Sequence, residues 1–116
     1  MDVALIVAII RTPALEATVT ALQRIGVRGI TVFKGKGFGE HPISHNFLSR
    51  DWAADEVKIE IYAGRDQAER IAATIIDAAH SGAPGDGLVA ILPVERVFSV
   101  RTRADTMPNR PATEDV

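Results

Sequence analysis

The chain has 116 residues, no cysteine, a formal net charge of −2 and 47% hydrophobic residues. Its length suits a single domain, and the lack of cysteine excludes disulfide frameworks, thiolate zinc sites and cysteine nucleophiles. The near-neutral charge gives no electrostatic basis for binding nucleic acid. No stretch approaches the roughly 18 apolar residues of a membrane-spanning helix, and we expect a cytoplasmic protein.

The first part of the chain predicts a strand, a helix and a second strand. Residues 3–10 form an aliphatic run, which predicts a central strand buried on both faces. The Thr12-Pro13 pair predicts a helix start, with the threonine as N-cap and the proline in the first turn. Gly26 is typical of the residue that follows a helix. A second strand is predicted from Gly29 toward Lys36.

The later part repeats this order. Residues 57–62 alternate between apolar and polar side chains, which predicts a half-buried strand. Asp66 is predicted to cap a second helix, whose apolar stripe runs over residues 68–79. Residues 81–87 predict a loop, and residues 88–100 predict a last strand or bent strand pair interrupted at Pro93.

Two β-α-β units in one short chain predict an α+β ferredoxin-like sandwich, with an antiparallel sheet and both helices on one face. The connection of residues 37–55 joins two strands that this fold pairs as a hairpin, yet it has 19 residues. Loops longer than about 12–15 residues without their own structure are usually functional or disordered. This connection is therefore a candidate functional segment, whereas residues 104–116 predict a flexible tail.

Two glycine-rich stretches are candidate ligand sites. Residues 36–39 read KGFG, and residues 81–87 read SGAPGDG, a segment that we call the glycine loop. Glycines let a backbone approach a ligand closely, and successive N–H groups can bind an anion. The alternative is that the first stretch is a hinge and the second an ordinary helix-to-strand connection. The glycine loop lacks the GKS or GKT ending of a P-loop.

The remaining charged and metal-binding side chains form no complete site. Arg101 and Arg103 are either a bidentate phosphate clamp or part of a solvated tail. His41 and His45 have the i, i+4 spacing of a helical metal site, but Pro42 argues against a helix there. A metal-binding or metal-sensing protein that uses these two histidines is thus an alternative function. No nucleophile–base pattern is visible, so we expect no enzymatic activity.

The order of these motifs resembles the P-II family of signal-transduction proteins. The matching segments are AIIR at 8–11, KGFG at 36–39, VKIEI at 57–61, GDG at 85–87 and RTR at 101–103. The resemblance implies a homotrimer whose P-II-like domain covers residues 1–103. It also implies ATP or ADP bound in clefts between subunits, and regulation of a partner transporter or metabolic enzyme, by family default in nitrogen utilisation.

The resemblance also assigns site residues. Residues 37–55 correspond to the T-loop, which docks onto partner proteins, and the glycine loop corresponds to the phosphate-contacting B-loop. In the T-loop, Phe38, Phe47, Leu48 and Trp52 are candidate partner anchors, unless they fold back onto the trimer. The implied nucleotide-binding set is Gly37, Gly39, Glu60, Ser81, Gly82, Gly85, Asp86, Gly87, Arg101 and Arg103.

Several positions depart from the family pattern. The modified T-loop tyrosine is absent, so we expect no uridylylation there. His41 replaces the glutamine used with Mg²⁺ for 2-oxoglutarate, and Glu56 replaces the lysine that pairs with its carboxylate, so we expect no 2-oxoglutarate response. Leu88 and Ser99 replace a lysine and an arginine at the phosphates. Losing two cations costs about 3 kcal/mol, roughly a hundredfold in affinity, so nucleotide binding is expected to be weakened.

Overall fold

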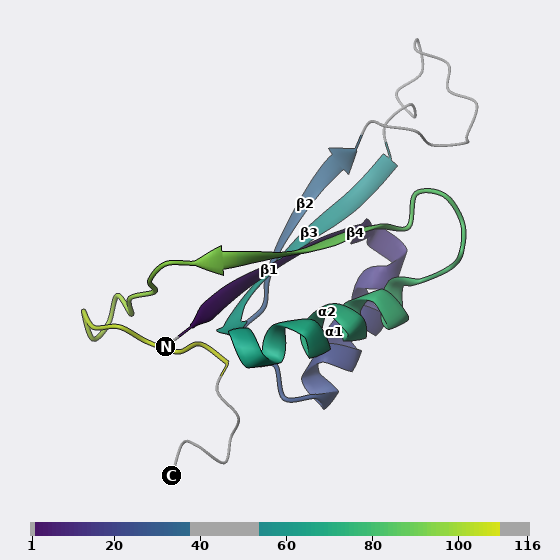
Figure 1. Ribbon diagram of the computed structural model, residues 1–116. Coiled ribbons are helices and arrows are strands. Elements are labelled where there is room, and N and C mark those ends of the chain that lie inside the picture. The colour runs from purple at the N-terminus through teal and green to yellow at the C-terminus, as the bar shows by residue number, and fades with distance from the viewer. Residues whose placement is uncertain (1, 38–53, 110–116) are drawn as a thin grey trace.

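The computed structural model describes residues 2–37 and 54–109 of the chain. It confirms the predicted βαββαβ order of an α+β ferredoxin-like fold (Figure 1). The elements are β1 (Val3–Arg11), the 3₁₀ turn η1 (Thr12–Ala14), α1 (Leu15–Arg24), β2 (Thr31–Gly37), β3 (Ala54–Gly64), α2 (Arg65–Ala79) and β4 (Gly87–Val94). Neither α-helix in these ranges is long and apolar enough to cross a membrane.

The four strands form one antiparallel sheet in the order β2-β3-β1-β4. As the aliphatic run predicts, β1 is central: its Ile6 pairs with Ile61 of β3 on one side and with Ile91 of β4 on the other. Because β1 and β3 run antiparallel, the chain leaves β1 through η1 at one end of the sheet and leaves β3 through α2 at the opposite end. This topology gives the sheet two ends with different loops.

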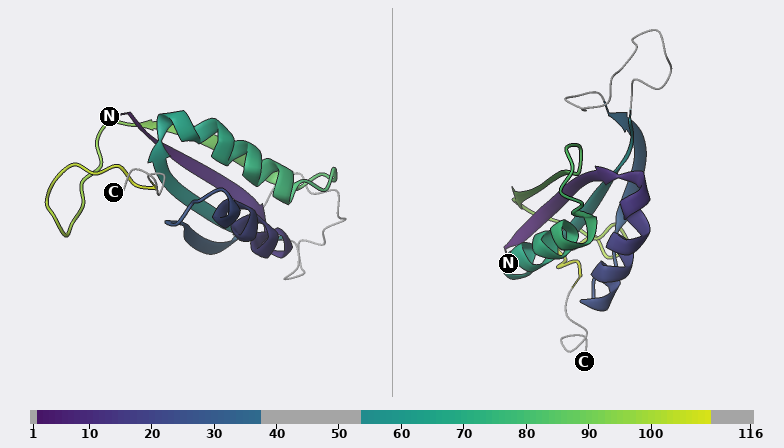
Figure 2. Two further views of the ribbon diagram at one scale, coloured as in Figure 1. Left: turned by 90° about the horizontal axis from the view of Figure 1, so that it is seen from below. Right: turned by 90° about the vertical axis from the view of Figure 1, so that its right-hand side faces the viewer.

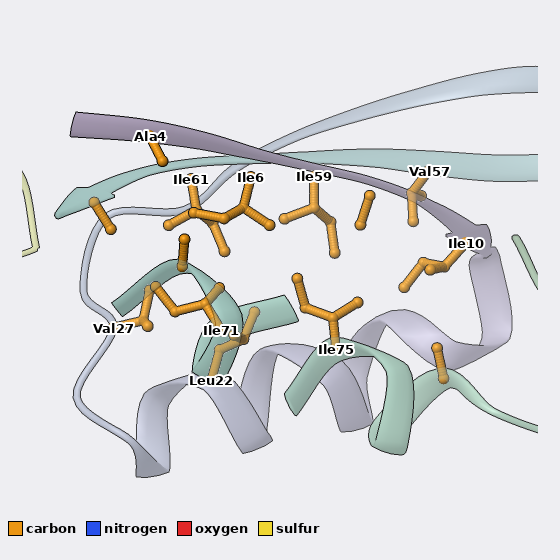
Figure 3. Packing of buried hydrophobic residues seen from close by; sticks show 14 of the residues in the cluster. Ala4, Ile6, Ile10, Leu22, Val27, Val57, Ile59, Ile61, Ile71 and Ile75 are labelled. Atoms are coloured by element: carbon orange, nitrogen blue, oxygen red, sulfur yellow. The ribbon is translucent and has the colours of Figure 1, made fainter. Parts of the chain in front are cut away.

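Both helices cover the same face of the sheet (Figure 2), and the hydrophobic core lies between the two layers (Figure 3). Ile6, Ile59 and Ile61 project from the strands toward Leu22 and Ile75 of the helices, and all five are fully buried. Burying one such side chain contributes roughly 1.5–3 kcal/mol. The core is aliphatic, as the scarcity of aromatic residues predicts.

The opposite face of the sheet has no covering element in the described part of the chain. On this face Leu5, Val7 and Ile9 of β1 are only half-buried, and Leu88 and Leu92 of β4 are 57% and 41% exposed. The prediction that β1 is buried on both faces is therefore wrong for a single chain. The apolar side chains are present on both faces, but one chain supplies helices for only one of them.

Two predicted helix caps are corrected. Thr12 does not cap α1: it begins the tight turn η1, makes no capping hydrogen bond with its side chain, and α1 starts three residues later at Leu15. Such 3₁₀ turns are frequent at helix N-termini. Asp66 lies within the first turn of α2, which has Gly64 as its N-cap. A carboxylate there still interacts favourably with the positive end of the helix.

The predicted end of α1 is confirmed. Gly26 follows the helix with a φ of +94°, and its N–H donates to the carbonyl of Gln23 at 3.0 Å. The N–H of Val27 donates to the carbonyl of Leu22 at 3.1 Å, which completes a Schellman motif. Glycine suits this position because side chains disfavour positive φ.

The last strand is shorter than predicted. β4 ends at Val94 and includes Pro93. An edge strand tolerates a proline because one side of the strand has no neighbouring strand to which a backbone N–H must donate. Beyond it the chain forms a loop with a single bridge between Phe98 and Asp105. Residues 104–109, predicted as the start of a mobile tail, make specific contacts, including the N–H of Thr106 with the carbonyl of Val97 at 3.0 Å. The mobility of the whole tail stays a prediction.

Candidate functional site

The glycine loop closes on a carboxylate of its own. The side chain of Asp86 accepts hydrogen bonds from the N–H of Ser81 at 2.8 Å, from the N–H of Gly82 at 2.9 Å and from the hydroxyl of Ser81. The Ser81 hydroxyl oxygen in turn accepts the N–H of Ala83 at 3.2 Å. An external phosphate would therefore meet the N–H groups of Ser81 and Gly82 only by displacing Asp86.

Arg11 and His80 lie beside Asp86 in this position. Arg11, the last residue of β1, brings its Nε within 3.3 Å of Asp86 Oδ1, and its Nη2 donates to the carbonyl of Ala79 at 3.2 Å. His80 Nδ1 lies 3.8 Å from Asp86 Oδ2. The hydrogen bonds from Ser81, aided by that from Gly82 and by the charge of Arg11, lower the pKa of Asp86 to about 2. Asp86 is therefore ionised at neutral pH.

The glycines of this loop are required by its backbone. Gly82, Gly85 and Gly87 have φ values of +85°, +91° and +116°. A Cβ at Gly87 would overlap the carbonyl oxygen of Ile9 in the neighbouring strand β1. The glycine-rich pattern thus lets the chain turn and re-enter the sheet edge against β1.

The described base of the T-loop lies at the same end of the sheet as the glycine loop (Figure 1). The last β2–β3 pair joins Gly37 to Ala54, and Lys36 forms an exposed ion pair with Asp55. The carboxylate of Glu56 lies over Gly37, where a Cβ would overlap it. The expected partner anchors Phe38, Phe47, Leu48 and Trp52, the histidines His41 and His45, and Gly39 lie outside the described residues.

Glu60 occupies a different place, on the uncovered face of the sheet. Its Oε2 lies 3.3 Å from the Nζ of Lys58, which also stands 4.9 Å above the ring of Phe33. Glu60 lines a cavity of 610 Å³ together with Thr31, Tyr62 and the segments 28–30 and 107–109. The walls of this cavity come from three separate parts of the chain.

Arg101 and Arg103 lie in the loop beyond β4, at the end of the sheet opposite the glycine loop (Figure 1). Both are exposed, and Arg103 has a φ of +63° with its N–H bonded to the carbonyl of Ser99 at 2.8 Å. A bidentate pair of Arg96 with Asp105, at 2.9 and 3.3 Å, closes the same loop. Within one chain the two candidate arginines therefore do not meet the glycine loop.

Sequence reasoning missed two side chains that organise these places. Arg11 was matched only as the end of a motif, but it is the cation beside Asp86. Asn109, at the end of the described chain, hydrogen-bonds the backbone of Arg28, Gly29 and Tyr62. The Pro-Asn pair at 108–109 signals a turn, but no local pattern identifies partners some 80 residues away.

The metal alternative gains no support from the described ranges. In residues 2–37 and 54–109, no group of three or more histidine, aspartate or glutamate side chains is arranged to hold a metal ion. His80 is the one histidine in these ranges, and its Nδ1 lies 3.8 Å from Asp86 Oδ2. The metal site at His41 and His45 stays a prediction.

Comparison with known proteins gives consistent results for sequence and structure. Residues 3–104 match the family model described as "Nitrogen regulatory protein P-II". The "Nitrogen regulatory protein P-II homolog" of Arabidopsis thaliana is 39% identical over 100 residues, 82% of this chain; the chain spans about half (51%) of that relative's length. Nitrogen regulatory protein GlnK2 of Haloferax mediterranei is 38% identical over 102 residues, 84% of this chain and 83% of that one.

A solved structure and a further sequence relative agree with this assignment. The crystal structure of Arabidopsis thaliana PII bound to citrate superposes with a TM-score of 0.76 and 36% sequence identity, covering 90% of this chain and 89% of that one. The P-II protein of Azospirillum brasilense is 39% identical over 100 residues, 82% of this chain and 88% of that one. Sequence and fold therefore agree over the region that carries all the described candidate residues.

Proposed function

The chain belongs to the nitrogen regulatory protein P-II family, and on this premise we propose that it is a trimeric regulator rather than an enzyme. It binds an adenine nucleotide, ADP or ATP, in clefts between subunits and controls a partner transporter or metabolic enzyme through its T-loop. The cytoplasm is the proposed location.

One observation carries this proposal: the candidate nucleotide-binding residues lie in three separate places of one chain. The glycine loop and Gly37 lie at one end of the sheet, Glu60 lies on its uncovered face, and Arg101 and Arg103 lie beyond its other end. A ligand cannot contact all of them within one subunit. A second copy that places its arginine loop beside the glycine loop would complete the site.

The uncovered sheet face supports the assembly. Leu5, Val7 and Ile9 on the central strand, with Leu88 and Leu92 on the edge strand, form an apolar surface that a single chain leaves open. Contiguous exposed apolar patches on soluble proteins mark interaction sites. Packing these faces around a common axis buries them and brings subunit edges together.

The proposed nucleotide site is weak for phosphate. Leu88, the residue after the GDG segment, is 57% exposed and has no charge to offer. Ser99 replaces a second cation in the loop that holds Arg101. Because fewer cations remain to bind phosphate, a ligand with fewer phosphates loses less binding energy. We propose that ADP binds at least as well as ATP.

The proposed site does not suit 2-oxoglutarate. The carboxylate of Glu56 lies over the backbone of Gly37. By resemblance to the family, Glu56 stands at the position of the lysine that pairs with the 2-oxoglutarate carboxylate. Like charges at close range cost several kcal/mol when desolvated. Citrate is bound in the Arabidopsis structure, but Glu56 opposes any such multiply charged carboxylate here.

Two measurements test the main proposal. Light scattering after gel filtration should give the mass of three 12.5 kDa chains, and Leu5→Glu, which places charges on the apolar face, should shift the protein toward monomers. Titration calorimetry should then show ADP binding that disappears in the Leu5→Glu monomer. A stable wild-type monomer, or nucleotide binding that survives the loss of the trimer, would contradict a shared site.

The role of the T-loop is tested separately. Trp52→Ala should weaken capture of a partner membrane protein or enzyme by about tenfold or more, as expected of a buried aromatic anchor, and leave the mass of the trimer unchanged. Ile76→Ala, which truncates an exposed apolar side chain on helix α2, away from the uncovered sheet face, serves as the control. If Trp52→Ala instead lowers trimer stability and spares partner capture, the tryptophan packs on its own assembly.

A further inference from the structure

A side-chain amide stands where the backbone pairing of β2 and β3 would otherwise continue. Thr31 pairs with Glu60 in the antiparallel register of β2 and β3, and the same register continued by two residues would pair Gly29 with Tyr62. The strands do not continue: β2 begins only at Thr31, whereas β3 extends to Gly64. Between the two backbones stands the side chain of Asn109, which arrives from the far end of the chain.

Every hydrogen-bonding position of this amide is used. Oδ1 of Asn109 accepts the N–H groups of Arg28 and Gly29, both at 2.8 Å. Nδ2 donates to the carbonyl of Gly29 at 3.2 Å and to the carbonyl of Tyr62 at 2.8 Å. Because the oxygen faces two donors and the nitrogen two acceptors, the orientation of the amide is fixed by its partners.

The backbone of Asn109 is suited to this role. Its φ is +54°, a left-handed conformation that asparagine tolerates better than most side chains. Asn109 also lines the 610 Å³ cavity that contains Glu60, together with Met107 and Pro108. The segment 107–109 therefore forms one wall of the cavity. The side-chain amide of Asn109 lies between the two strands at the edge of the cavity.

The chemistry of the amide indicates what can replace it. Gly29 presents an N–H and a C=O side by side, and these groups are complementary to any ligand that has an acceptor next to a donor. The amide of asparagine has this pattern, and so does adenine, where the N6 amino group lies beside the acceptor N7. A ligand with such an edge, placed in the cavity beside Glu60, would compete for the same backbone groups of Gly29.

We propose that Asn109 is an internal competitor for this cavity: its amide must leave Gly29 and Tyr62 before the base of an adenine nucleotide can enter. This inference rests on the proposed nucleotide binding and adds its regulation. Apparent affinity is reduced by the fraction of molecules in which the amide is in place. Release costs four hydrogen bonds, so binding is coupled to the position of the C-terminal segment.

The test compares Asn109→Gly with Ala104→Gly by ADP titration calorimetry on the full chain. Glycine at 109 keeps the left-handed backbone available and removes only the amide. Glycine at 104 gives the same added freedom to the same segment, at an exposed residue without a contact to the cavity. We expect Asn109→Gly to bind ADP about tenfold more tightly than the wild type, and Ala104→Gly to match the wild type within twofold.

Hydrogen exchange gives a second measurement that does not need a nucleotide affinity. In the wild type, the amides of Arg28 and Gly29 should exchange slowly, and they should exchange faster in Asn109→Gly. A saturating concentration of ADP should leave the Gly29 amide of the wild type protected while the side-chain amide of Asn109 loses its hydrogen-bonded NMR shift. This combination distinguishes replacement of the amide from simple loosening.

The outcomes separate this inference from the proposed function. Equal ADP affinity in wild type and Asn109→Gly, or weaker binding in the variant, overturns the competition and leaves nucleotide binding intact. Binding by the variant alone supports both. ADP binding by neither protein overturns both, whatever the exchange rates show.

Discussion

The two ends of the sheet are closed by side chains that do the same task with different chemistry. At one end, Asp86 accepts the consecutive N–H groups of Ser81 and Gly82; at the other, Asn109 accepts those of Arg28 and Gly29. Asp86 reaches back four and five residues, whereas Asn109 reaches across 80 and 81. One closure is local and charged, and the other is long-range and neutral.

This difference predicts different behaviour. Charge-assisted hydrogen bonds are roughly twice as strong as neutral ones, and Arg11 adds an ion pair to Asp86. A contact over four or five residues also orders little chain, whereas a contact over 80 residues depends on the whole intervening fold. We infer that the Asp86 closure fixes the shape of the glycine loop, and that the Asn109 closure is the one suited to open and close.

The largest expected effect on stability is at Gly87, the residue that follows Asp86. Gly87→Ala places a methyl group against the carbonyl oxygen of Ile9 at a φ of +116°, so either the loop or β1 must shift. We expect the free energy of unfolding to fall by about 3 kcal/mol or more, measured by urea denaturation.

Gly35→Ala is the control for this substitution. Its added Cβ has no heavy atom within 4 Å and its φ is not in the positive range. We expect a change within about 0.5 kcal/mol. Equal effects of the two substitutions would mean that Gly87 does not approach β1 as closely as described.

The same comparison shows what a sequence can reveal. The GDG segment, the glycine that ends α1 at Gly26 and the alternating strand around Val57 are local patterns, and the structure confirms each of them as an element or turn. The contact of Asn109 with Gly29 has no local signal, because its partners are defined only after the sheet has formed. The position of the glycine loop was predictable for this reason, and the contact of Asn109 with Gly29 was not.

The predicted start of β3 and the predicted end of β4 were wrong for related reasons. β3 begins at Ala54 rather than Val57, because Asp55 and Glu56 continue the ladder with β2 although their side chains break the apolar alternation. The end of β4 at Val94 depends on its place at the edge of the sheet, which no periodicity shows. One face of β1 is left uncovered because a single chain supplies helices for only one face of the sheet.

A smaller effect is expected from pH, and only at the Asp86 end. The folded-state pKa of Asp86, about 2, lies below its ordinary value of 3.8, so its ionised form stabilises the fold above pH 4. That contribution should be lost as the pH falls from about 4 toward 2. Asp86→Asn should flatten the pH dependence of the melting temperature in this window and lower the melting temperature at pH 7.

Asp105 must be separated from this effect. Its hydrogen bonds with Arg96 also lower its pKa, so it contributes acid sensitivity in the same direction. Asp105→Asn should remove only the acid sensitivity that Asp105 contributes and leave that of Asp86 in place. Asn109→Gly should leave the acid profile unchanged, since its partners are neutral backbone groups; a changed profile would show that the two closures are coupled.

The smallest effect is expected at the neutral closure itself. A Cβ on Gly29 would lie 3.5–3.9 Å from the amide atoms of Asn109, an ordinary contact, and the φ of Gly29 is not in the positive range. Gly29→Ala should therefore be tolerated, and because alanine restricts the unfolded chain, it should change stability by between zero and about +1 kcal/mol. The opposite signs expected at Gly29 and Gly87 follow from one geometric difference: the first glycine faces a side chain with room beside it, and the second faces a backbone carbonyl that cannot move without β1. A loss of 2 kcal/mol or more in urea denaturation of Gly29→Ala would show that the Asn109 closure is as rigid as the charged one, and that it does not open.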